Sequence, residues 1–267
     1  MTQAQGDRAG FYDDPLIYHV LHLQGTAAEV RVFERIARRH AEGADSGSLR
    51  WLEPASGSGR YLHVLAKLGH RGVGIDLSEG MNEFAAAEAK RLGVGGRLKF
   101  VTASMERFDA GRGRFDVAFN PINSVRHLAS DKAVLDHLAC VKRSLRRGGV
   151  YLVGVEVTPP GIAQPTEDVW QGRIAGLRVH QFVSYLPPEG RSRHEKVISH
   201  KTVIQGRGKA KVERHIDSVY SLRTYTREQW LTLLDASGWE VVACYGPTGR
   251  LKRFEPVGYC LQVLKPR

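Results

Sequence analysis

Cysteine is scarce in this sequence, and long apolar runs are missing. The 267 residues contain only Cys140, Cys244 and Cys260, which stand far apart with no Cys-x-x-Cys pair. This spacing argues against a zinc site and against a disulfide framework, so we expect buried free thiols and no metal. No apolar stretch is long enough to span a bilayer, and the first residues lack the pattern of a secretion signal. We therefore expect a cytoplasmic protein that does not cross a membrane.

Two common nucleotide-binding motifs are also missing. The P-loop pattern G-x-x-x-x-G-K-[ST] occurs nowhere in the chain, which excludes ATP binding by that route. A dinucleotide fingerprint needs a third glycine after Gly57 and Gly59, and Leu62 stands in its place. The sequence therefore disfavours NAD as the ligand.

The overall composition is that of a folded protein with an excess of positive charge. Hydrophobic residues make up 42% and charged residues 25%, and we expect residues 1–267 to form a single domain around one core. The net charge is +11, from 39 basic and 28 acidic residues. Such an excess favours an anionic partner such as RNA, but the basic residues are dispersed along the chain, as on a solvated surface. Nucleic acid is therefore the less favoured partner.

A glycine turn between an expected strand and an expected helix organises the rest of the chain. Residues 49–52 are mostly apolar and lead to Glu53, and apolar residues recur at helical spacing over residues 61–67. Glycine at 57 and 59 allows positive φ and the close approach of a ligand. Residues 72–76 indicate a second strand that ends in Asp76, where a βαβ fold binds ribose hydroxyls. These features predict a phosphate-free nucleoside ligand with a charged amino-acid tail.

The same stretches resemble two motifs of the class I S-adenosylmethionine (SAM)-dependent methyltransferases of the small-molecule type. Residues 53–60, EPASGSGR, are similar to the family's E-P-A-C-G-T-G-R, and residues 74–81 fit its G-x-D-x-S-x-x-M. Small serines stand at positions 56 and 58, so the turn is preserved. The resemblance implies SAM as the cofactor and S-adenosylhomocysteine as the product. It implies a Rossmann-like α/β fold with a seven-stranded sheet, helices on both faces, and an antiparallel β insertion between strand five and the last helix.

The resemblance also implies which residues bind the cofactor. In the family, the first acid lies near the ammonium of SAM and the second acid accepts both ribose hydroxyls. The expected residues are Tyr12, Glu53, Ala55, Gly57, Gly59, Arg60, Asp76, Leu77, Met81, Ser104, Met105, Asn120 and Pro121.

Three of these assignments have an alternative or a departure. Tyr12 either attracts the sulfonium by cation–π interaction or anchors a terminal helix. Met81 either packs on adenine or fills the core. Ser104 stands where many members carry an acid that binds the adenine amino group.

Further segments are expected before and after this core. Residues 1–48 should form an N-terminal helical cap, with a helix that starts at Pro15 after Asp14. Residues 131–147 show helical periodicity, and residues 150–157 form a near-continuous apolar run that predicts the fifth strand. From about residue 158 to 223 the chain is rich in β-formers, with strands expected over 178–185, 196–205 and 211–222. This insertion should cover the active site as a lid.

The loop after the fourth expected strand should face the methyl group. Residues 121–128, PINSVRHL, are similar to the P-x-N-S-x-R-H-L run of small-molecule members. His127 is a candidate general base or substrate ligand, or alternatively a cap of the following helix. Glu156 is a second candidate base that could hold an amine, or alternatively the partner of an arginine. The candidate substrate-binding residues are Tyr18, Asn123, Arg126 and Trp170, and for Trp170 a core role is the equal alternative.

These observations favour methyl transfer from SAM to an N or O nucleophile of a small molecule. Two alternatives stay open. The net charge leaves room for an RNA methyltransferase. The missing acid near Ser104, together with the lack of a clear base, leaves room for a SAM-binding protein without transferase activity.

Overall fold

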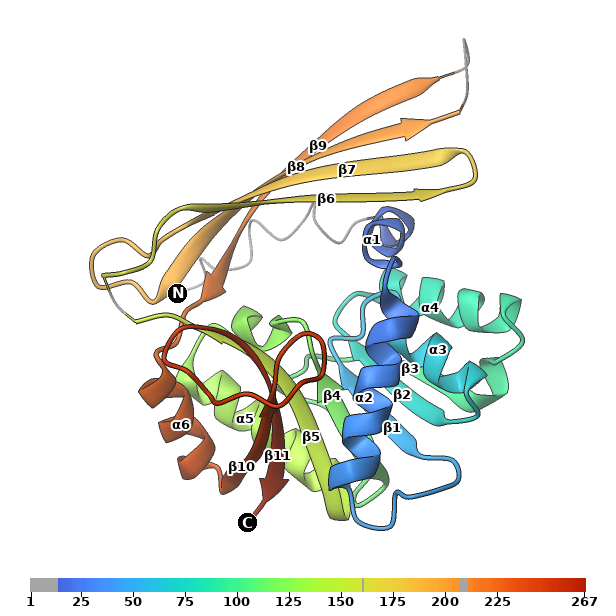
Figure 1. Cartoon of the computed structure of the whole chain (residues 1–267). Helices are drawn as coiled ribbons and strands as arrows, with labels where there is room; N and C mark the ends of the chain where they lie inside the picture. Colours follow the sequence, from blue (N-terminus) through green and yellow to red (C-terminus); the bar gives the residue numbers. More distant parts are fainter. Residues whose placement is uncertain (1–13, 160, 207–210) are drawn as a thin grey trace.

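The computed structural model describes residues 14–159, 161–206 and 211–267. Its core is a seven-stranded sheet with the strand order β10-β11-β5-β4-β1-β2-β3 (Figure 1). The strands are β1 (Arg50–Pro54), β2 (Arg71–Asp76), β3 (Leu98–Thr102), β4 (Phe115–Asn120), β5 (Leu145–Val157), β10 (Trp239–Tyr245) and β11 (Gly258–Pro266). The first five pair in parallel, and β11 pairs antiparallel with both β5 and β10. The predicted seven-stranded α/β sheet is confirmed, and the antiparallel pair of β10 and β11 closes it.

Alternation along β5 separates two apolar layers. Tyr151, Val153 and Val155 face one layer, whereas Val150 and Leu152 face the other, and all five are fully buried. The layer of Val150 and Leu152 is completed by α2 (Thr26–His40) and α3 (Arg60–Lys67), and the layer of Tyr151 by α5 (Asp131–Ser144) and α6 (Arg227–Ala236). A strand that is buried on both faces reads as a continuous apolar run, which explains why the sequence signal here was strong.

Side-chain caps fix where several helices begin. Asp14 accepts a hydrogen bond from Ile17 N at the start of α1 (Pro15–His22), and Ser78 accepts one from Met81 N at the start of α4 (Glu79–Arg91). Thr226 and Gln229 form a capping box at α6. Each cap satisfies a backbone N–H that the helix leaves without an internal partner. Within the described ranges, no helix is long and apolar enough to cross a membrane.

The insertion forms a second, antiparallel sheet in the order β6-β7-β8-β9. Its strands are β6 (Thr166–Ile174), β7 (Leu177–Leu186), β8 (His194–Gln205) and β9 (Val212–Arg223). One face of β6 and β7 packs on α1, and a Cβ at Gly172 would lie 2.1 Å from Val20 O, so only glycine permits this approach. Thr158 N donates to Tyr225 O over 2.9 Å, so the two ends of the insertion meet.

Two expectations about element boundaries were wrong. The insertion has four strands instead of three, because β6 carries Glu167, Asp168 and Gln171 and is exposed along most of its length, which hides its alternation. The helix expected over residues 131–147 is α5, which ends at Ser144, and β5 already begins at Leu145. The basic residues 146 and 147 before Gly148 suggested a helix terminus, but they belong to the strand.

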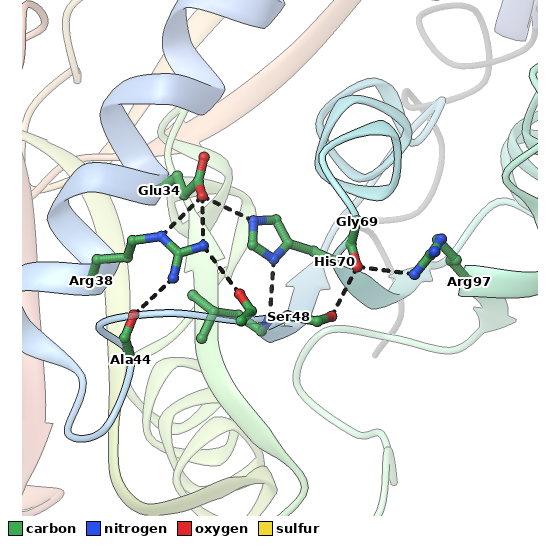
Figure 2. A network of polar contacts seen from close by, with 9 residues as sticks. Glu34, Arg38, Ala44, Ser48, Gly69, His70 and Arg97 are labelled. Atoms are coloured by element: carbon green, nitrogen blue, oxygen red, sulfur yellow. Dashed lines mark hydrogen bonds and ion pairs between the residues drawn. The ribbon is translucent and has the colours of Figure 1, made fainter.

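A polar network joins α2 to the amino ends of β1 and β2 (Figure 2). Glu34 Oε1 accepts from Arg38 Nε at 3.0 Å and lies 3.2 Å from His70 Nε2. His70 Nδ1 accepts from Leu49 N at 3.0 Å, just before β1. Backbone carbonyls complete the network: Arg38 donates to Ala44 O and Gly47 O, and Ser48 and Arg97 both donate to Gly69 O. The network holds the loop after α2 against the sheet.

Candidate active site

The glycine turn follows β1 with strained backbone geometry. Gly57 and Gly59 have φ of 51° and 70°, and Ala55 has φ of 56°. Among the described residues, Ala55 and Asn123 are the two non-glycine residues with positive φ, and they follow β1 and β4 at the same edge of the sheet. Positive φ at residues with a Cβ persists where the surroundings enforce it, and it concentrates at functional sites. The carboxyl edge of the sheet is therefore the place to search for a ligand.

Asp76 at the end of β2 supports this turn through its carboxylate. Its Oδ2 accepts from Gly57 N at 2.7 Å and its Oδ1 from Ser78 N at 2.9 Å. Burial raises the pKa of Asp76, and the backbone hydrogen bonds from Ser78, Gly57 and Leu77 oppose this rise. One carboxylate thus holds together the two turns that the sequence singled out.

Buried polar atoms without partners gather beside the turn. In the part of the chain that the structure describes, Glu53 Oε2, Ser56 Oγ and Asn120 Oδ1 have no hydrogen-bond partner. Asn120 Nδ2 donates to Pro54 O at 2.8 Å, which joins the ends of β4 and β1. Burial raises the pKa of Glu53 well above its usual range, with Arg60 opposing the rise. Unsatisfied buried groups are unfavourable, so this donor and acceptor set fits a polar ligand with a cationic group.

Arg60 stands at the start of α3 and is buried. It donates to Thr26 Oγ1 at 2.7 Å, pairs with Glu29 at 3.0 Å, and stacks on the ring of Tyr61 at 3.8 Å. Its charge is therefore already neutralised by the protein. Arg60 positions α2 against the turn and lines the cavities described below.

Helix α1 lies over the glycine turn. A Cβ at Gly57 would lie 2.9 Å from Tyr18 Cε1, so the tyrosine ring rests directly on the turn. His19 Nδ1 and Ser58 Oγ are 3.0 Å apart. Burial lowers the pKa of His19, so this histidine is neutral near pH 7. Tyr18, expected to bind substrate, thus borders the glycine turn as well as the larger cavity.

The remaining residues expected at the cofactor are spread around the same edge. Leu77 is 64% exposed, Met81 is fully buried in α4, and Ser104 Oγ accepts from Glu106 N. Met105 packs against the apolar layer of α5, and its carbonyl bonds to His137. Their contacts with adenine stay predictions. Tyr12 lies outside the described residues.

A cavity of about 1100 Å³ opens between the core and the insertion sheet. Its walls come from α1, α2, the loop after β4, the end of β5, the insertion, and the loop between β10 and β11. A smaller cavity, bordered by Glu53, Ser56 and Asn120, adjoins it and shares Tyr18 and Arg60. The glycine turn and the large cavity therefore lie next to each other.

The loop after β4 brings three predicted residues into the large cavity. Asn123 Oδ1 accepts from Glu156 N at 2.7 Å, which ties the loop to β5. His127 stacks on Tyr220 of β9, with ring centroids 5.8 Å apart and planes at 25°. The alternative that His127 caps the next helix is wrong, because Ser130 caps α5. Glu156 lies 3.5 Å from the guanidinium of buried Arg126, so its alternative as the partner of an arginine is confirmed.

Trp170 on β6 borders the cavity from the insertion. Its ring lies 5.6 Å from that of His22 on α1, and the residue is 42% exposed, so a core role is wrong. Burial lowers the pKa of His22 to about 3, which keeps this imidazole neutral.

Sequence reasoning missed two carboxylates that the insertion contributes to the cavity wall, Asp168 on β6 and Glu195 on β8. Both lie on strands of the insertion, which is far in sequence from the glycine turn and the loop after β4. The alternation of β8 could have placed Glu195 on the inner face together with Val197, but no local signal connects it to Arg126. Its position depends on the packing of the insertion.

The stretch that contains the glycine turn is also the one that a comparison with protein families identifies. Residues 52–149 match the family model of the methyltransferase domain. This stretch contains the glycine turn, Asp76 and the strands β2 to β4. The match supports the predicted methyltransferase domain over these residues, and the solved structures share the predicted Rossmann-like fold.

Solved structures share nearly the whole architecture. DesVI of Streptomyces venezuelae is similar with a TM-score of 0.72 at 23% identity, covering 97% of this chain and 98% of DesVI. The sugar N-methyltransferase KedS8 of a Streptoalloteichus species is similar with a TM-score of 0.70 at 22% sequence identity, over 98% of this chain and 96% of KedS8. The SAM-bound structure of CalS10, an amino pentose methyltransferase of Micromonospora echinaspora, has a TM-score of 0.64 at 21% sequence identity. The match covers 90% of this chain and 91% of CalS10. No curated protein matches the sequence. The similarity includes the insertion sheet.

Proposed function

We propose that this protein binds SAM and transfers its methyl group to a nitrogen or oxygen nucleophile of a small molecule. The observation that carries the proposal is the group of unpaired polar atoms at Glu53, Ser56 and Asn120, next to a glycine turn held by Asp76. A buried carboxylate needs a cationic partner, and the ammonium of an amino-acid tail supplies one. Asp76 is suited to ribose hydroxyls.

The protein would act mainly by alignment. When bound, SAM would supply a methyl group on a sulfonium sulfur, and this sulfur is a good leaving group because it departs as a neutral thioether. Tyr18 and α1 cover the turn and exclude water from it, and the adjoining cavity holds the acceptor. His127 and Glu156 border that cavity and are the groups of the core able to take a proton from the nucleophile. The names of KedS8 and CalS10 favour an amino sugar as the acceptor.

An RNA acceptor receives less support. The chain has a net charge of +11, but the described residues that line the large cavity include four carboxylates and two arginines. A polyanion would be repelled at the point where transfer takes place. Strong salt-dependent binding to structured RNA would reverse this ranking.

The proposal is tested in two steps. Calorimetric titration should show one SAM and one S-adenosylhomocysteine bound per chain, and the absence of both in folded protein would refute it. Formation of S-adenosylhomocysteine is then measured over a panel of amino sugars, simple amines, phenols and sugar hydroxyls. Binding without turnover on any acceptor would instead favour a SAM-binding protein without transferase activity.

A further inference from the structure

The insertion places a carboxylate against a buried arginine of the core. Glu195 Oε1 on β8 lies 2.6 Å from Arg126 Nη2, and the side chains are 15% and 6% exposed. Both residues line the large cavity. A pair this short between nearly buried side chains is fixed in position, because separating it would leave a charge without a partner.

Arg126 is also held from the core side. Its Nη1 lies 3.5 Å from Glu156 Oε2 on β5, and its Nε donates to Arg223 O at 2.9 Å. One guanidinium therefore lies between two carboxylates, one from the core sheet and one from the insertion. Since a single positive charge neutralises only one of them, negative charge remains at this point of the cavity wall.

The rest of the wall does not cancel this charge. Arg60 is already paired with Glu29, and Asp168 adds a further carboxylate beside Tyr185. Among the described lining residues, four carboxylates face two arginines, which gives a formal charge of −2 in a chain of net charge +11. A concave wall of one sign concentrates ligands of the opposite sign. The wall of the cavity thus carries a net negative formal charge even though the whole molecule is basic.

We propose that Glu195, together with Glu156, binds the protonated amine of the acceptor, and that Glu195 takes the proton that frees this nitrogen for attack. The assignment rests on the proposed methyl transfer. The lone pair of the freed nitrogen forms the new N–C bond while the C–S bond breaks toward sulfur. The product forms as the protonated methylamine, and the proton held by Glu195 passes to solvent, which restores the carboxylate.

The surroundings of Glu195 suit a proton acceptor. Burial raises the pKa of its carboxyl group, Arg126 opposes the rise, and Glu156 adds to it. A base works best when its pKa approaches the working pH, so this shift brings Glu195 closer to that range than an exposed glutamate. Tyr185 and Tyr220 lie in the same part of the cavity, and burial raises the pKa of both, so they stay neutral.

The decisive variant is Glu195→Gln, which keeps the shape and removes the charge. With the amine acceptor found by the panel, we expect KM to rise roughly 10- to 100-fold, the range of a lost hydrogen bond to a charged group. Glu195→Asp keeps the charge and should retain part of the affinity. The matched control is Glu213→Gln on β9 of the same insertion, where the side chain is exposed and paired with Lys211, and it should leave KM unchanged. Affinity for S-adenosylhomocysteine should stay the same in all three, which also verifies folding.

A second measurement needs no variant. Hexoses with one amine at C2, C3 or C4, and their N-acetyl derivatives, are titrated into the wild-type protein saturated with S-adenosylhomocysteine. We expect at least one amine to bind and its N-acetyl derivative to bind at least about 10-fold more weakly.

The outcomes separate the two proposals. Failure to bind S-adenosylhomocysteine would refute the proposed function. If S-adenosylhomocysteine binds normally, three results would refute only the role of Glu195. These are an unaltered KM in Glu195→Gln, equal binding of the amine and its N-acetyl derivative, and no binding of any amino hexose.

Discussion

The two ends of the parallel sheet use polar residues in opposite ways. At the amino ends of β1 and β2, Glu34, Arg38 and His70 bond to one another and to the backbone (Figure 2). At the carboxyl end, Glu53 and Ser56 keep buried oxygen atoms that no described residue satisfies. Because unpaired buried polar groups are unfavourable, a fold retains them where a ligand completes them. The presence or absence of hydrogen-bond partners thus separates residues that hold the sheet together from residues that suit the proposed ligand.

The largest effect should come from filling the glycine turn. Gly57→Val places a branched side chain at φ 51° and a Cβ 2.9 Å from Tyr18, so we expect affinity for S-adenosylhomocysteine to fall at least about 100-fold. Gly43→Val is the control at the amino end, with φ 65° and nothing within 4 Å of the new Cβ. Both variants should lose roughly 1–2 kcal/mol of stability from the backbone alone. Calorimetry and urea unfolding measure the two quantities, and equal affinity in both variants would contradict the comparison.

Two aspartates provide a second, smaller test. Asp76 accepts from Gly57 N and Ser78 N at the carboxyl end, whereas Asp116 accepts from Arg50 N at 2.7 Å and from Arg146 at the amino end. Asp76→Asn should weaken S-adenosylhomocysteine binding roughly 10- to 100-fold, because a charged acceptor is lost at the ligand. Asp116→Asn should lower the free energy of unfolding by about 1–2 kcal/mol and leave binding intact. A loss of binding in Asp116→Asn would mean that the two ends are not independent.

The smallest effect concerns pH at the amino end. Burial lowers the pKa of His70, and Glu34 only partly opposes this. Above the ordinary histidine pKa of about 6.5 the imidazole is neutral in both the folded and the unfolded chain. Below that pH the unfolded chain takes up the proton first, so the free energy of unfolding decreases as the pH is lowered. From pH 7 to 5, His70→Asn should reduce this fall by about 1 kcal/mol relative to wild type. Urea unfolding at both pH values measures it, and identical slopes would remove His70 as a contributor. Affinity for S-adenosylhomocysteine should be equal in the two proteins at pH 7.

The sequence was sufficient where function and local structure use the same residues. The positions of Gly57, Gly59 and Asp76 follow from turn chemistry at the ends of adjacent strands, and the structure joins Gly57 N to the Asp76 carboxylate by a hydrogen bond. The capping residues Ser78 and Thr226 were equally readable, since a cap interacts with its own helix.

Other features depend on contacts between distant parts of the chain. Glu195 meets Arg126 only because the insertion folds back over the loop after β4, and neither residue has a local pattern that predicts the pair. Strand β6 escaped notice for a related reason, because both of its faces are largely exposed and polar residues interrupt the alternation. The boundary at Leu145 failed because Gly148 is typical of a helix end, whereas here the strand continues through it.

The hydrogen bond between Thr158 N and Tyr225 O closes the base of the insertion. The chain therefore leaves the core and rejoins it at one point, and the sheet β6 to β9 belongs to a single continuous stretch of sequence. Segments whose ends lie together are tolerated as replaceable units, since exchanging them leaves the remaining fold connected. Evolution could thus exchange this part of the wall of the large cavity as one unit, while the glycine turn and Asp76 stay in place.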